Sequence, residues 1–156
     1  MYECLNIQGN TWYFPSPANI GLVKTGDTDV VLIDSIPFLY DVKGFLQTLT
    51  VIEQTPANFF IPSHADPTRD IHPLVDLNRE KVNQLCELIV QFCDIPIHFE
   101  ALLKKVFDHY GLSLNFNQYV LAGSTLKSFL SYLYDLKQVD ALFTDNMLLW
   151  VTVHGV

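Results

Sequence analysis

The sequence predicts an α+β protein with two parts, and three observations support this class. Residues 1–72 contain short β-prone runs and one helical segment. Residues 73–156 contain three amphipathic helical segments followed by two β-prone runs around a turn. The composition changes near Pro73, whose fixed φ and missing N–H suit the first turn of a helix. A chain of 156 residues can bury one core or two small ones.

Short strands are predicted throughout the first part. Residues 11–14 form a β-prone run that ends before Pro15, and residues 19–24 and 30–33 flank a turn at residues 26–29. This last pair predicts a β-hairpin, because both runs are too short for helices and rich in β-branched residues. A further buried strand is expected over residues 59–61, where Pro62 would end it.

Apolar residues at helical spacing predict four helices. The first covers residues 40–54 and contains Gly44, which weakens a helix. The second begins near Pro73 and is broken at residues 94–96. The third covers residues 99–110, with His98 at the N-cap position and Gly111 as the C-terminal stop. The residues expected to face the core are Val42, Phe45, Leu46, Leu49, Val82, Leu85, Cys86, Ile89, Cys93, Leu102, Leu103, Val106, Phe107, Tyr119, Leu126, Phe129, Leu130 and Leu133.

The fourth helix opens at Asn115, where Gln118 three residues later resembles a capping box. Gly123 within it is a kink or a close-packing point. Residues 141–143 and 147–153 then predict a hairpin around a turn at residues 144–146. Three helices followed by a hairpin is the order of elements in a winged-helix unit.

Charge and hydropathy exclude several classes. The net charge is −8, divided as −5 over residues 1–72 and −3 over residues 73–156, so neither part has the basic surface that nucleic-acid binding needs. No run approaches the ~18 apolar residues of a membrane span, and we expect no leader peptide. Three cysteines without a disulfide framework favour a reducing cytoplasm. A hydrophobic fraction of 49% is a hint of a buried interface between chains.

Three strings in order carry a resemblance to a known family. Residues 19–23 (Asn-Ile-Gly-Leu-Val) and 31–35 (Val-Leu-Ile-Asp-Ser) resemble the opening strands of metallo-β-lactamase-fold hydrolases. Residues 62–67 (Pro-Ser-His-Ala-Asp-Pro) resemble the segment that carries the last metal ligand of that family. The tail from residues 76–80 (Asp-Leu-Asn-Arg-Glu) to Trp150 resembles the winged-helix extension of one bacterial subgroup.

The resemblance also implies a large internal deletion. The main signature of the family, His-x-His-x-Asp-His, would place its first histidine at Pro62 and its last at Pro67, and proline has no ligand atom. A helix and a strand precede His64 and the extension follows it, which is the context of the final histidine ligand. Residues 1–35 then match the start of the fold and residues from Ile36 match its end. The junction would lie near residues 35–36, and the central metal-binding region would be missing.

His64 is the one metal ligand that the resemblance transfers. Catalytic zinc needs about three protein ligands and an open position. Asp66, His72 and Asp34 are secondary candidates, and Asp70 lies beside His72 in sequence. We predict no catalytic residues and no bound cofactor. Zinc would be expected only if the chain were a hydrolase whose ligands are completed in an oligomer.

Two other activities find little support in the sequence. The fourth helix would be the DNA-reading element of a winged helix, but it offers only Lys127 and Lys137, with Asp135 between them, and Asp145 would occupy the wing turn. No nucleophile elbow or phosphate-binding glycine loop occurs. No nucleic-acid-binding residue is therefore predicted.

These observations combine into one prediction. Residues 1–72 are expected to form a truncated metallo-β-lactamase-like β-layer with one helix, and residues 73–156 a winged-helix-like unit of three helices and a β-hairpin. Removing half of a two-layer fold leaves apolar sheet surface and strand edges uncovered. We therefore expect a homodimer or higher homo-oligomer without hydrolase activity. A zinc-dependent hydrolase and a nucleic-acid-binding module are the alternatives.

Overall fold

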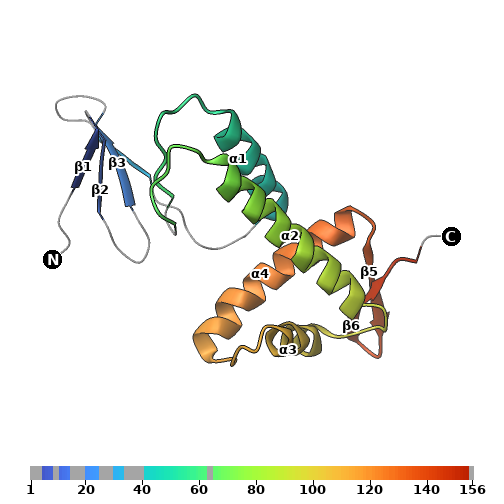
Figure 1. The fold of residues 1–156 in the computed structure, drawn as a ribbon. Coiled ribbons are helices and arrows are strands. Elements are labelled where there is room, and N and C mark those ends of the chain that lie inside the picture. Colours follow the sequence, from blue (N-terminus) through green and yellow to red (C-terminus); the bar gives the residue numbers. More distant parts are fainter. Residues whose placement is uncertain are drawn as a thin grey trace. The chain divides into compact units, whose positions relative to one another are not determined.

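The computed structural model describes residues 5–8, 11–14, 20–24, 30–33, 41–62 and 65–154 (Figure 1). It shows a mixed α+β chain, as predicted. Two compact units are present: residues 1–37 with 54–73, and residues 38–53 with 74–156. The proposed junction at residues 35–36 lies outside the described residues.

The first unit contains a four-stranded antiparallel sheet. Its strands are β1 (Leu5–Gln8), β2 (Thr11–Phe14), β3 (Ile20–Lys24) and β4 (Val30–Ile33), and they pair in sequence order. The predicted hairpin is confirmed, because Gly21 to Lys24 pair in register with Ile33 to Val30. The sequence analysis missed β1, whose alternation of apolar and polar residues is only four residues long.

The predicted strand over residues 59–61 is wrong in extent. Only Phe60 pairs, in an isolated antiparallel bridge to Thr68, with N–H to O distances of 2.8 and 3.0 Å. The apolar run is real, but Pro62 lacks the N–H that a longer ladder would need. One bridge therefore joins Phe60 to Thr68 in place of a longer ladder.

The second unit combines four helices with a hairpin. The helices are α1 (Val42–Gln54), α2 (His72–Phe92), α3 (Phe99–His109) and α4 (Phe116–Asp135), and the hairpin strands are β5 (Val139–Thr144) and β6 (Met147–Thr152). Helix α4 packs on α3 and on β5, and α3 packs on β6 (Figure 1). The core of this unit comprises Val42, Val82, Cys86, Ile89, Cys93, Ile97, Leu102, Leu103, Phe107, Leu126, Phe129, Leu130, Leu133 and Val139. Most of the predicted inward-facing residues are therefore confirmed.

Helix α1 belongs to the second unit, although the sequence-based division at residues 72 and 73 assigned it to the first part. Val42 is 1% exposed and lies in the core of the second unit, with Phe45 and Leu46 packed against it. The Arg79 guanidinium on α2 makes two hydrogen bonds to the Glu53 carboxylate, at 3.1 and 2.7 Å. The apolar stripe of α1 thus packs into the core that the C-terminal helices form.

Hydrogen bonds at the helix caps support the predicted boundaries of α3 and α4. The His98 ring accepts a hydrogen bond from the Ala101 N–H, and the Asn115 side chain accepts one from the Gln118 N–H. Gly111 has φ +63° and follows α3 in a Schellman motif, in which the Leu112 N–H donates to the Phe107 carbonyl at 2.9 Å. The side chain of Gln118 forms no second half of the capping box, since its Oε1 is buried without a hydrogen-bond partner among the described residues.

The hairpin turn is also confirmed. Thr144 pairs with Met147, and Asp145 and Asn146 adopt φ values of 51° and 60°. Two consecutive positive φ values are the pattern of a type I′ turn, which Asn and Asp tolerate better than most residues. The outer edge of β6 is anchored by backbone hydrogen bonds between Trp150 and Ile97.

Candidate functional site

The loop that carries the predicted metal ligands is shaped by local hydrogen bonds. Beyond the bridge between Phe60 and Thr68, the Arg69 guanidinium lies 5.7 Å from the centre of the Phe59 ring. The Thr68 hydroxyl donates to the Asp70 carbonyl and accepts from the Asp70 N–H, at 2.8 and 3.1 Å. These contacts lead the chain into the first turn of α2.

Asp70 and His72 form a close pair of titratable side chains at the start of α2. Asp70 Oδ1 lies 2.8 Å from His72 Nδ1 and also accepts the His72 backbone N–H at 3.1 Å. The side-chain hydrogen bond from His72, followed by the backbone one, holds the pKa of the Asp70 carboxyl below its usual value. Both side chains are exposed, so the main effect of the pair is local: Asp70 satisfies the backbone N–H of His72 at the start of α2.

The described residues do not bring the candidate metal ligands together. Asp34 and His64 lie outside them, Asp66 is exposed, and His72 is engaged with Asp70. No group of three or more His, Cys, Asp or Glu side chains gathers within the described ranges. A histidine that bonds a carboxylate through Nδ1 resembles a metal ligand held by its second shell, but two neighbouring groups are fewer than catalytic zinc needs.

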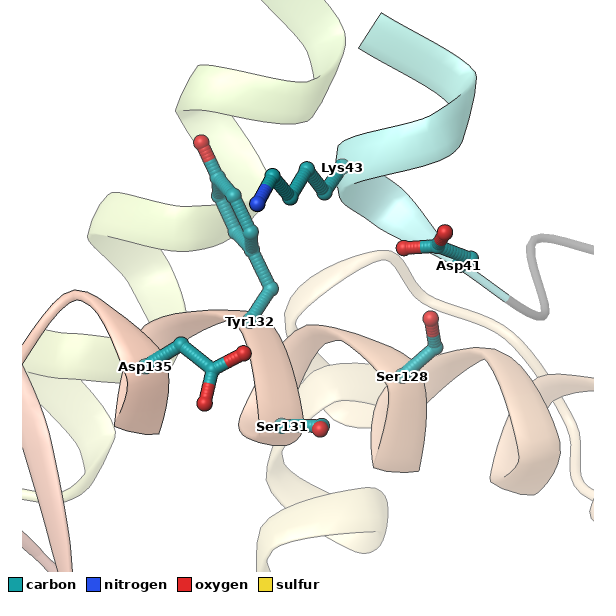
Figure 2. Close-up of a pocket in the computed structure, with 6 residues that line it drawn as sticks. All are labelled: Asp41, Lys43, Ser128, Ser131, Tyr132 and Asp135. Carbon is teal, nitrogen blue, oxygen red and sulfur yellow. The ribbon is translucent and has the colours of Figure 1, made fainter. Parts of the chain in front are cut away.

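The second unit contains a cavity of about 250 Å³ between the first turn of α1 and the C-terminal half of α4 (Figure 2). Figure 2 shows Lys43 extending from α1 toward Tyr132, while the Ser128 hydroxyl points toward Asp41. Two acidic residues, one lysine, two serines and one tyrosine therefore line a single hollow. Its lining residues are Asp41, Lys43, Ser128, Ser131, Tyr132 and Asp135.

This cavity lacks the geometry of a catalytic centre. The Ser128 Oγ is buried and has no hydrogen-bond partner among the described residues, so no general base is placed to activate it. Among the described residues, the thiols of Cys86 and Cys93 are also buried. Burial raises the pKa of each to about 11, which keeps both protonated and unreactive at neutral pH.

The lysine within α4 and the lysine just after it both contact aromatic rings. Lys127 Nζ lies 5.0 Å from the centre of the Phe99 ring, and Lys137 Nζ lies 4.9 Å from that of Tyr134. Asp145 occupies the hairpin turn. The arrangement offers a nucleic-acid backbone few cations and an opposing carboxylate.

The most extensive unusual feature of the second unit is exposed apolar surface. Phe116 is 80% exposed and Phe143 is 73% exposed, at the start of α4 and near the tip of the hairpin. Other large apolar side chains close to each in the sequence are also exposed. Near Phe116 they are Leu112, Leu114, Tyr119, Val120 and Leu121, and near Phe143 they are Leu142, Met147 and Leu148.

The sequence analysis missed this surface, and for Tyr119 it was wrong. Tyr119 is 41% exposed although its spacing predicted a core position. One signal was available in the sequence, because residues 110–126 contain no Asp, Glu, Lys or Arg. An exposed helix in a soluble unit ordinarily carries charge on its solvent face.

Comparison with known proteins gave no match to a family model and no match to a curated protein. Among the helices that the structure describes, none is both long and apolar enough to cross a membrane.

Proposed function

We propose that this chain is a self-associating, internally deleted relative of the metallo-β-lactamase-fold hydrolases and has no hydrolase activity of its own. Its C-terminal unit would be the winged-helix-like extension of that family and would mediate association between copies. The single observation that carries the proposal is the exposed apolar surface of the second unit, led by Phe116 and Phe143.

Self-association is supported by the number of large apolar side chains that are exposed near Phe116 and Phe143 in the sequence. Isolated exposed apolar side chains are ordinary, whereas contiguous exposed patches mark interaction sites. The hairpin is apolar on both faces, with Leu142 and Met147 on one and Phe143 and Leu148 on the other. An antiparallel hairpin with one solvated face would alternate apolar and polar residues.

The absence of hydrolase activity is supported by the sequence, which contains no His-x-His-x-Asp-His signature. Of the metal ligands of the family, the resemblance transfers only His64. The winged-helix identity is supported by the order of elements, with α2, α3 and α4 followed by the β5–β6 hairpin. The lysines and Asp145 described above favour a role for this unit in protein contacts over nucleic-acid binding.

Native mass spectrometry of the full chain tests the proposal, because it reports subunit number and bound metal together. We expect a dimer or higher oligomer at micromolar concentration, without metal, before and after incubation with zinc and removal of the excess. A monomer would contradict self-association. Stoichiometric zinc in an oligomer would instead support the hydrolase alternative, and His64, Asp66 and His72 would then be the first residues to substitute.

A further inference from the structure

We draw no further inference here: the strongest candidate, the cavity of about 250 Å³ between the first turn of α1 and the C-terminal half of α4, is lined mainly by exposed polar side chains, and nothing among the described residues shows which ligand it would bind.

Discussion

Lys137 adopts a backbone conformation at the end of a helix that lowers the stability of the folded chain. It follows α4 with φ 59°, and the Gln138 N–H donates to the Leu133 carbonyl at 2.9 Å in a Schellman motif. This position usually belongs to glycine, because a β-carbon in the left-handed region costs roughly 1–2 kcal/mol. Gly111 fills the equivalent position after α3 without that cost.

Lys137→Gly should therefore raise the free energy of unfolding by about 0.5–1 kcal/mol, the strain relieved being partly offset by the greater entropy of glycine in the unfolded chain. Urea denaturation followed by circular dichroism measures the change. Lys137→Ala is the matched control, since it also removes the contact with Tyr134 but keeps the β-carbon, and it should give no gain. Equal gains in both variants would show that backbone strain is not the cause.

The buried thiols of Cys86 and Cys93 make the stability of the folded chain depend on pH. Desolvation is the main cause that raises their pKa values from 9.0 to about 11, with Glu87 adding to the rise at Cys86 and Lys105 opposing it at Cys93. A folded-state pKa above the unfolded value means that folding favours the protonated thiol. Its contribution to stability is therefore complete below pH 9.0 and is lost as the pH rises through about 11.

We expect the unfolding free energy of the wild-type chain to fall more steeply between pH 9 and pH 11 than that of the Cys86→Ala/Cys93→Ala variant. Each protein is compared with its own value at neutral pH, which removes the cost of the small cavities. Chemical denaturation at several pH values measures both slopes. Parallel curves would mean that the two thiols titrate no differently in the folded chain.

At the scale of elements, α1 is the clearest example of a helix whose place is set by packing. Its sequence neighbours lie in the first unit, yet Val42 enters the core of the second. The ion pair between Arg79 and Glu53 joins α1 to α2, with both side chains about 30% exposed. A bidentate, partly buried pair of this kind adds directional specificity to the apolar contact.

Val42→Ala should lower the free energy of unfolding by about 1–3 kcal/mol, because it opens a cavity in the core of the second unit. Val51→Ala is the matched control in the same helix. Val51 is 64% exposed, so its substitution should change stability by no more than about 0.5 kcal/mol. Urea titrations of both variants give the comparison, and equal losses would contradict the packing of α1 into this core.

For the whole molecule, the net charge of −8 opposes the proposed association of copies. Added salt screens this repulsion, since the Debye length falls from ~10 Å at 0.1 M to ~3 Å at 1 M. The surface proposed to mediate association is led by Phe116 and Phe143, which carry no charge, so added salt would weaken no ion pair between these residues. We expect the dimer dissociation constant to fall by about two- to tenfold as the salt concentration rises over this range.

Sedimentation equilibrium at several sodium chloride concentrations measures this dependence. Repeating the series with a Lys81→Gln variant shows whether the trend follows total charge, since that variant makes each copy more negative by one charge at an exposed position on α2 and should respond slightly more. A dimer that weakens as salt increases would indicate that ion pairs between copies hold it together, contrary to the neutral contact proposed.

The amino-acid sequence by itself determined the helices, most strands and their caps. Four local signals act over only a few residues, so each can be predicted without knowledge of the rest of the chain. They are helical spacing, the glycine at position 111, the asparagine at position 115 and the turn at residues 144–146. The acidic balance and the lack of a basic surface follow from composition alone. The adjacency of Asp70 and His72 was visible in sequence, although their hydrogen bonds were not.

Only the tertiary structure decided which apolar faces are covered. Tyr119 and Leu126 share one stripe of α4, yet Tyr119 is 41% exposed and Leu126 is 3% exposed. Spacing along a helix sets which residues share a face, but burial depends on what lies opposite. Helix α4 has 20 residues, whereas its neighbour α3 has 11. Helix α3 is therefore too short to cover the whole apolar stripe of α4. The same dependence on distant partners placed α1 in the second unit and left Phe116 exposed at the start of α4.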